Sequence, residues 1–286
     1  EELVGKYRQF STQIRNQTSS NGEGIMDQPV MIKDGVYWIG ALDPGLVVFD
    51  IVIPTKHGTT YNAYLVRGEK IAVIETVKSY CVDGFISKIR SLVRPEDIDY
   101  IIINHTEPDH SGGLIRLMEL APNAIPVFSR GARTFVKNIL HKEFDYKEVK
   151  AGDSIDLGGK VLKFISAPFL HWPDTMFTYL ETDKILFPCD AFGSHYCSDK
   201  RFNDELSSKE DAFTAYEFYY DTILRPFKKH VLDALKNIKD IDIDIIAPSH
   251  GPILRENLDK YINAYREWAG KAKKYPDKKK ISVIYV

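Results

Sequence analysis

The chain is short of cysteine, of net charge and of long hydrophobic runs. Its 286 residues carry a formal net charge of −2, so the charge balance gives no reason to expect a nucleic acid or an anionic membrane as partner. No apolar run is long enough to span a bilayer. The three cysteines include no Cys-x-x-Cys pair, which argues against a disulfide framework and against a cysteine-based zinc or iron–sulfur site. We therefore expect Cys81, Cys189 and Cys197 to be ordinary packing residues of a reducing compartment.

The N-terminal stretch does not read as an export signal. Residues 1–24 are polar, rich in Ser, Asn and Gln, and lack the apolar core of a secretory signal, so we interpret them as a polar tail. The hydrophobic fraction of 44% and the charged fraction of 27% are those of an ordinary globular protein. Together these features predict a cytoplasmic protein.

Short strand-like runs and helical periodicities alternate along the chain and predict an α+β fold. The expected strands are 36–40, 47–52, 60–66, 70–74, 99–104, 125–128, several within 146–169, then 175–180, 184–187 and 241–247. The expected helices are 83–93, 114–120, 131–141, 208–237 with an interruption at Pro226, and 255–271. The order of elements repeats in two similar halves, which indicates two sheets packed between outer helices.

The last residues predict a change of organisation. Residues 271–280 hold six lysines and Pro276, which is typical of an exposed linker. Residues 281–286 read as a strand, either an edge strand of the same domain or the first strand of a further one. We therefore divide the chain into the tail 1–24, one domain over 25–275, and a linker with the start of a further domain over 276–286.

The most informative stretch is residues 105–110, His-Thr-Glu-Pro-Asp-His, directly after the expected buried strand 99–104. Four of its six side chains are imidazoles or carboxylates: His105, Glu107, Asp109 and His110. Such groups are costly to bury unless something pairs with them, and a metal ion is the usual partner. Because Pro108 breaks a helix and the spacing is wrong for a helical metalloprotease signature, we expect an extended loop that turns alternate side chains inward.

Three more candidate ligands follow apolar runs: His171, Asp190 and His250. Taken singly, either histidine could be an ordinary hydrogen-bonded residue, and Asp190 could cap a turn. Taken with the stretch 105–110, they make seven ligands, which is too many for one ion. Two ions that share a bridging carboxylate would each have about four protein ligands and keep open positions. Oxygen-rich ligation with imidazole and no thiolate suits iron or manganese.

The remaining histidines differ in what their positions predict. His195 and Tyr196 lie just after Asp190 and are expected to line the site. His141 and His230 are expected on helix surfaces.

The spacing of these residues resembles the diiron core of the flavodiiron proteins, or A-type flavoproteins. The likeness rests on the motif His-x-Glu-x-Asp-His at 105–110, followed by His171, Asp190 and His250. It rests also on the amino-acid sequences of residues 170–175 and 189–193. It covers roughly residues 25–275 and implies the αββα sandwich of the metallo-β-lactamase superfold. Hydrolytic zinc members usually carry His where Glu107 stands, so Glu107 is the most discriminating residue.

The resemblance also implies how the ligands divide and which residue lies behind them. One iron would be held by His105, Glu107 and His171. The other would be held by Asp109, His110 and His250, with Asp190 bridging the two irons alongside an oxo, hydroxo or water bridge. Tyr196 resembles a tyrosine that lies behind the ligands in this family.

The family reduces dioxygen to water, nitric oxide to nitrous oxide, or both. The resemblance implies electrons from FMN in a flavodoxin domain that follows the diiron domain, with rubredoxin or a similar carrier as donor. It also implies a head-to-tail homodimer in which the flavin of one subunit approaches the irons of the other. Residues 281–286 resemble the first flavodoxin strand, so we expect no FMN site within this chain and expect turnover to need the FMN domain.

Two other functions remain open. The chain could be a flavin-free diiron sensor that binds oxygen without turnover. It could also be a dinuclear zinc hydrolase of the wider superfold, which metal analysis would reveal as two zinc ions and no iron.

Overall fold

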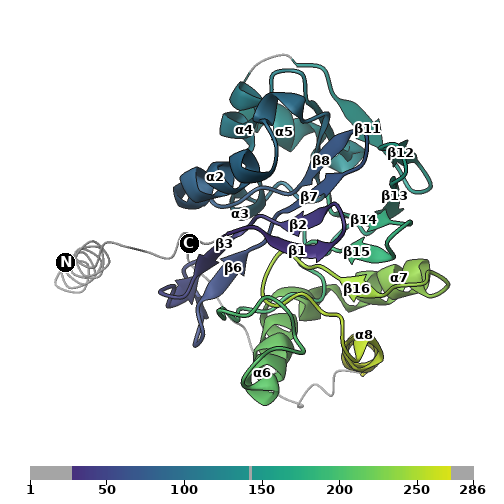
Figure 1. Ribbon diagram of the computed structural model, residues 1–286. Coiled ribbons are helices and arrows are strands. Elements are labelled where there is room, and N and C mark those ends of the chain that lie inside the picture. Colours follow the sequence, from purple (N-terminus) through teal and green to yellow (C-terminus); the bar gives the residue numbers. More distant parts are fainter. Residues whose placement is uncertain (1–27, 142–143, 272–286) are drawn as a thin grey trace, which may run out of the picture.

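Two β-sheets pack face to face, with helices on both outer faces (Figure 1). The computed structural model describes residues 28–141 and 144–271. The layer order is helix, sheet, sheet, helix, so the predicted α+β fold with an αββα sandwich is confirmed.

The larger sheet has seven strands and the smaller has five. In spatial order the larger comprises β1 (Val30–Lys33), β2 (Val36–Trp38), β7 (Tyr64–Arg67), β8 (Ile71–Ile74), β9 (Tyr100–Ile103), β10 (Ile125–Ser129) and β11 (Lys147–Val149). The smaller comprises β12 (Ser154–Asp156), β13 (Val161–Ser166), β14 (Met176–Leu180), β15 (Ile185–Phe187) and β16 (Ile245–Ile246). Strands β8 to β11 are parallel, as are β15 and β16, and the other neighbours are antiparallel. Two small ribbons pair β3 (Ala41–Asp43) with β6 (Thr59–Tyr61) and β4 (Val48–Phe49) with β5 (Ile53–Pro54).

Each sheet has its own set of helices (Figure 1). The seven-stranded sheet is covered by α2 (Val82–Leu92), α4 (Leu114–Leu120) and α5 (Arg133–Leu140). The five-stranded sheet is covered by α6 (Lys209–Tyr219), α7 (Lys228–Ile238) and α8 (Leu258–Gly270). Shorter helical turns are α3 (Pro108–Ser111), the 3-10 turns Ser79–Cys81, Pro95–Asp97, Arg130–Ala132 and Arg225–Phe227, and a π turn at Tyr220–Leu224. The last two interrupt the helical region 208–237 around Pro226, as predicted.

The strands are apolar on both faces because both faces are buried. One buried cluster lies between the sheets and includes Val66, Ile74, Ile102, Phe164 and Phe187. Alternate residues of the same strands belong to a second buried cluster, together with the helices: Leu65, Val73, Ile101, Phe85 and Leu117. This alternation follows from the two-residue period of a strand, so each strand is packed on both of its faces.

Three of the predicted strands differ most from the ranges that the sequence indicated. The run 47–52 contains only β4, because the chain turns at Asp50 and Ile51, which both have positive φ. The run 60–66 divides into β6 and β7 at Asn62, whose backbone N–H donates to the Ser249 carbonyl instead of to a neighbouring strand of the sheet. The run 241–247 keeps only β16.

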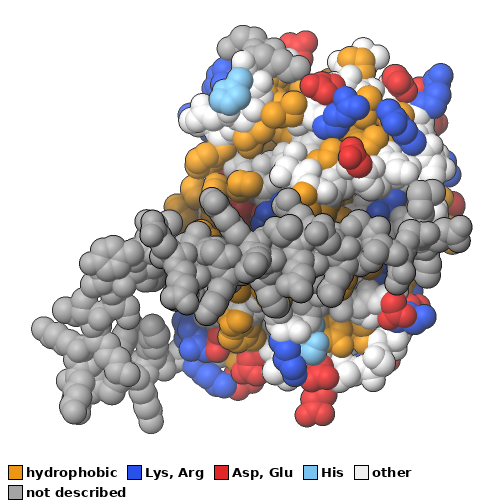
Figure 2. Space-filling view, turned by 90° about the vertical axis from the view of Figure 1, so that its left-hand side faces the viewer, with side chains coloured by type: hydrophobic (Ala, Val, Ile, Leu, Met, Phe, Trp, Pro, Cys, Tyr) orange, Lys and Arg blue, Asp and Glu red, His pale blue; other side chains and the backbone are white. Residues whose placement is uncertain are grey.

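Some expectations lie outside the described residues: the tail 1–24, the linker and strand over 276–286, and the domain limits at 25 and 275. Among the residues that are described, no helix has both the length and the apolar character needed to cross a membrane. On the part of the surface coloured by type in Figure 2, Lys and Arg side chains are interspersed with Asp and Glu, in keeping with the net charge of −2.

Candidate metal centre

The structure brings all seven predicted ligands together where strands of both sheets end. His105 follows β9, Asp190 follows β15 and His250 follows β16. His171 lies in the loop between β13 and β14. The site therefore draws its side chains from loops of both halves of the sandwich, at the carboxyl ends of most of these strands.

The prediction of an extended loop over 105–110 is wrong in its second half. Residues 108–111 form the helical turn α3, and Pro108 is its first residue. Proline is tolerated there because its fixed φ suits the first helical position and its missing N–H has no helical partner anyway. The Ser111 hydroxyl donates to the carbonyls of Thr106 and Glu107 at 2.9 and 3.0 Å. Asp109 and His110 are thus presented from a turn of helix.

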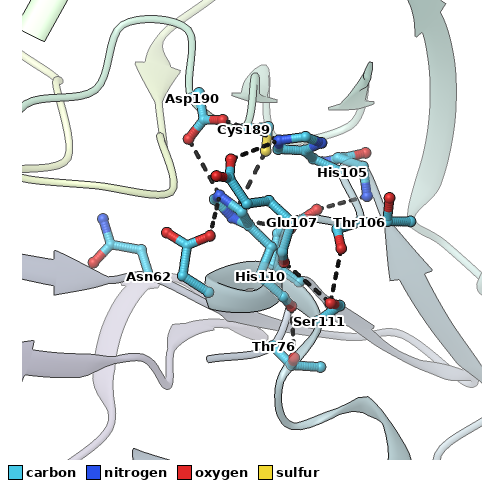
Figure 3. A network of polar contacts seen from close by, with 12 residues as sticks. Asn62, Thr76, His105, Thr106, Glu107, His110, Ser111, Cys189 and Asp190 are labelled. Atoms are coloured by element: carbon cyan, nitrogen blue, oxygen red, sulfur yellow. Dashed lines mark hydrogen bonds and ion pairs between the residues drawn. The ribbon is translucent and has the colours of Figure 1, made fainter. Parts of the chain in front are cut away.

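Three residues form the first ligand group around one oxygen of Glu107. Oε2 of Glu107 lies 3.1 Å from Nε2 of His105 and 3.0 Å from Nε2 of His171. The same two nitrogens each lie 3.5 Å from Oδ2 of Asp190. Figure 3 shows the side chains of His105, Glu107 and Asp190 pointing toward one another.

The second ligand group lies on the other side of Asp190. Oδ1 of Asp190 is 3.2 Å from Nε2 of His110 and 3.4 Å from Nε2 of His250. The Asp109 oxygens lie 3.4 Å from Nε2 of His110 and 3.2 Å from Nε2 of His250. Asp190 therefore offers one oxygen to each group, which is the arrangement of a bridging carboxylate.

These distances fit a pair of divalent cations. Metal–ligand bonds of about 2.1 Å separate neighbouring ligand atoms by roughly 3.0 to 3.4 Å in octahedral or tetrahedral geometry. Within the described part of the chain, both oxygens of Asp109, Oδ2 of Asp190 and Nε2 of His110 are buried and make no hydrogen bond of acceptable geometry. Buried polar atoms without partners are costly, and cations at these two positions would satisfy them.

The far nitrogens of two histidines are held by acceptors. Nδ1 of His250 donates to the Thr60 carbonyl at 2.6 Å, and Nδ1 of His105 lies 3.3 Å from Oδ1 of Asp174. Asp174 in turn accepts from the amide and hydroxyl of Thr106. A proton on Nδ1 leaves the lone pair of Nε2 free to bind a metal.

The carboxylates give the site a strongly negative potential. Burial disfavours the imidazolium, but Asp174 and Glu107 outweigh it and raise the pKa of His105 to about 9. Burial also disfavours the charged form of His250, but Asp109 and Asp190 outweigh this effect and raise the pKa of His250 to about 9. Although burial favours the neutral acid, His105 and His171 hold the pKa of Glu107 below its usual range. The same anionic charge favours cations.

Comparison with known families places the chain in a recognised group. A family model described as "ODP family beta lactamase" matches residues 59–251, a range that includes all seven ligand-type residues. The chain belongs to the ODP family beta lactamases.

Named relatives of this ODP family chain include a flavo-diiron protein, type A flavoproteins and a nitric oxide reductase. It is 47% identical over 232 residues to flavo-diiron protein FprA2 of Clostridium acetobutylicum, covering 80% of this chain and 58% of that protein. It is 42% identical over 255 residues to a nitric oxide reductase of Moorella thermoacetica, covering 87% and 64%. The chain thus spans about three-fifths of the length of these relatives.

Solved structures agree with this placement. The flavodiiron protein from Giardia intestinalis superimposes with a TM-score of 0.81 at 30% identity, over 85% of this chain and 59% of that one. The rubredoxin oxygen:oxidoreductase from Desulfovibrio gigas gives 0.82 at 31%, over 85% and 61%. The predicted resemblance to flavodiiron proteins is confirmed.

Tyr219, which the sequence did not single out, contacts one of the ligand-type residues of this ODP family chain. Tyr219 is the last residue of α6, and its hydroxyl donates a hydrogen bond of 3.0 Å to Oδ1 of Asp190. Tyr196 instead packs against His57 at 4.9 Å between ring centroids, so its expected role behind the ligands stays a prediction. His195 does border the site, with its ring 5.5 Å from that of His250 and its Nδ1 2.9 Å from the Thr59 hydroxyl.

The two ligand groups differ in exposure. The side chains of His171 and Glu107 are 19% and 13% exposed, whereas those of Asp109, His110 and His250 are buried. A small molecule therefore reaches the first group more easily.

His230 lies on a helix as expected, whereas His141 lies one residue beyond its helix and Cys189 lies beside His110. His141 ends α5 with a left-handed backbone, and His230 is half-buried on α7. Cys81 and Cys197 are half-buried, and Cys189 is buried.

Proposed function

We propose that this chain is the diiron domain of an oxidoreductase that reduces dioxygen to water, nitric oxide to nitrous oxide, or both. In this proposal His105, Glu107 and His171 hold one iron, and the other is held by Asp109, His110 and His250. The proposal depends above all on Glu107, whose Oε2 lies within 3.1 Å of two imidazole nitrogens. A carboxylate at that position makes the donor set rich in oxygen, which favours iron over zinc.

The chain's own residues prepare the site for small diatomic substrates. Two ferrous ions, when bound, supply two electrons and open coordination positions. Asp190, with one oxygen toward each ligand group, keeps the two positions close together. Tyr219 donates a hydrogen bond to Asp190 and so fixes the orientation of the carboxylate. The partial exposure of His171 and Glu107 admits the gas, while the buried ligands exclude bulk water from the second position.

Partners follow by analogy with relatives. The similarity to a rubredoxin oxygen:oxidoreductase and to a nitric oxide reductase supports both gases as substrates and rubredoxin as donor. We propose that FMN in a flavodoxin domain passes the electrons on, within a head-to-tail homodimer in the cytoplasm.

Single-turnover chemistry tests the proposal. Protein produced with iron and zinc both available should contain two iron ions per chain. Once reduced without oxygen, it should convert two nitric oxide molecules to one nitrous oxide, because two ferrous ions hold two electrons. The matching oxygen experiment measures consumption by stopped flow, and reduction to water should consume one dioxygen per two chains because it takes four electrons. Two zinc ions and no iron would overturn the proposal, and reversible oxygen uptake without consumption would favour the sensor.

A further inference from the structure

His110 has a buried carboxylate behind it that no part of the proposed ligand set uses. Glu75 follows β8 directly and is 1% exposed. Its Oε1 accepts from the Asn104 amide at 2.6 Å, just before His105. Its Oε2 makes no hydrogen bond of acceptable geometry within the described residues, and it lies 3.4 Å from Nδ1 of His110.

The chemistry of imidazole explains the contact. Nε2 of His110 faces Asp109 and Asp190 at the second metal position. When Nε2 binds a metal through its lone pair, a neutral imidazole carries its proton on Nδ1. That proton needs an acceptor, because an unpaired buried N–H is costly. Glu75 places a carboxylate oxygen 3.4 Å from that nitrogen, much as Asp174 places one 3.3 Å from Nδ1 of His105.

The next residue holds the backbone of the same histidine. Both the amide and the hydroxyl of Thr76 donate to the His110 carbonyl, at 2.9 and 2.5 Å. The Thr76 hydroxyl also accepts from the Gly113 amide at 3.1 Å. Figure 3 shows Thr76 next to the backbone of His110. Glu75 has a φ of 62°, a left-handed conformation that a non-glycine residue keeps only where its surroundings require it.

We infer that Glu75 is the positioning residue of His110 and sets the strength of the second metal position, as the counterpart of Asp174 at the first. A carboxylate on the far nitrogen orients the ring and makes the imidazole a stronger donor. The inference rests on the proposed function only in that His110 must be a metal ligand. Cys189 is the competing partner, since its sulfur lies 3.8 Å from the same nitrogen.

Cobalt(II) binding to the metal-free protein tests the inference without any catalytic readout. Competition with a chelator should give two binding constants for the unaltered chain. Glu75→Gln keeps the size of the side chain and removes its charge, so one constant should fall about tenfold to a hundredfold and the other should stay unchanged. The visible spectrum of the weakened cobalt should shift, which a purely structural role would not cause. Asp174→Asn should weaken the other cobalt instead.

Cys189→Ala is the matched control, because it removes the other group next to Nδ1 of His110. We expect its effect to be under threefold, since a thiol at 3.8 Å is a weak partner. Unchanged constants in Glu75→Gln would overturn the inference. So would equal weakening of both sites together with a loss of circular dichroism, which would make Glu75 purely structural. A chain that binds two cobalt ions and needs Glu75 for one of them, but reduces neither gas when loaded with iron, would overturn the proposed function alone.

Discussion

At the scale of single residues, the donor set decides which metal the site prefers. Glu107 adds a third carboxylate to Asp109 and Asp190, and it contacts both histidines of its group. Three negative charges would nearly balance two divalent ions, so little uncompensated charge would be buried and the cost in free energy would be small. An imidazole in place of Glu107 would leave more positive charge uncompensated and would offer nitrogen where iron prefers oxygen.

Replacing Glu107 by histidine should therefore change the metal. In protein made with both metals available, Glu107→His should take up zinc at the first position, and gas reduction should fall at least tenfold. Elemental analysis and single-turnover assays measure the two effects. Glu107→Asp, which keeps the carboxylate, should retain more iron than Glu107→His. Two irons and full activity in the histidine variant would contradict this expectation.

Tyr219 allows a second test with a matched neighbour. Burial raises the pKa of this phenol well above its ordinary value, so its hydroxyl remains a donor to Asp190 at all working pH values. Tyr219→Phe should lower turnover roughly tenfold and the free energy of unfolding by about 1.5–3 kcal/mol, since the lost bond goes to a charged group. Tyr216→Phe, on the same helix, loses a bond to the Tyr261 carbonyl and should cost stability without slowing turnover. Equal turnover in both variants would show that the hydrogen bond from Tyr219 to Asp190 does not contribute to turnover.

At the scale of elements, the sequence predicts regular periodicity well and local exceptions poorly. The strands that end at the site were visible as apolar runs followed by His or Asp. The helical turn at Pro108 was missed because proline was read as a breaker, although it suits the first position of a helix. Asp174 and Tyr219 were missed as site residues because they contact ligands 69 and 29 residues away. Such contacts depend on how the sheets pack, which no local pattern encodes.

Asn62 shows what such an exception does for the fold. It ends β6 early, accepts from the Trp38 indole at 2.8 Å, and donates to the carbonyls of Pro248 and Gly251 at 2.8 and 2.9 Å. The last two residues flank the loop of His250. The interruption of the strand therefore ties β2 to a metal-site loop.

Asn62→Ala should destabilise the chain by about 3 kcal/mol, because it leaves the buried indole N–H of Trp38 and the Gly251 carbonyl without their partner, while the Pro248 carbonyl keeps its bond from Tyr64. Urea unfolding measures the loss, and the chain should also bind metal more weakly as the His250 loop loosens. Asn237→Ala is the control, since that amide makes one exposed bond to the Ser166 carbonyl and should cost under about 1 kcal/mol. A similar small loss in both variants would show that Asn62 does not hold the loop.

At the scale of the whole molecule, the site joins the two halves of the sandwich. The loop 105–110 extends from the seven-stranded sheet, whereas His171, Asp190 and His250 belong to the five-stranded half. Cations bound between these groups would link the halves, and without cations protons must compensate the carboxylates. As the pH rises, the stability of the metal-free protein should therefore fall, whereas its affinity for metal should increase.

The metal-free protein should lose stability as pH rises from about 6.5 to above 9. In the fold, the pKa values of His105 and His250 are raised to about 9, against about 6.5 in an unfolded chain. Between these two pKa values the folded chain holds more protons than the unfolded chain. The contribution of the two histidines to the free energy of unfolding is therefore fully present below pH 6.5 and is lost as the pH rises through about 9. Glu107 and Asp190 act oppositely, because their pKa values are lowered in the fold, and they remove stability only as pH falls below about 4.5.

Cobalt should reverse this trend, because it displaces the protons of His105 and His250 and binds more tightly as pH rises. Urea unfolding in chelator at pH 6 and pH 9.5 should differ by on the order of 3 kcal/mol or more. Cobalt-saturated protein should show a much smaller difference or an opposite one. If the stability of the metal-free protein stayed constant or rose between these pH values, the carboxylates of the site would not raise the pKa values of the two histidines.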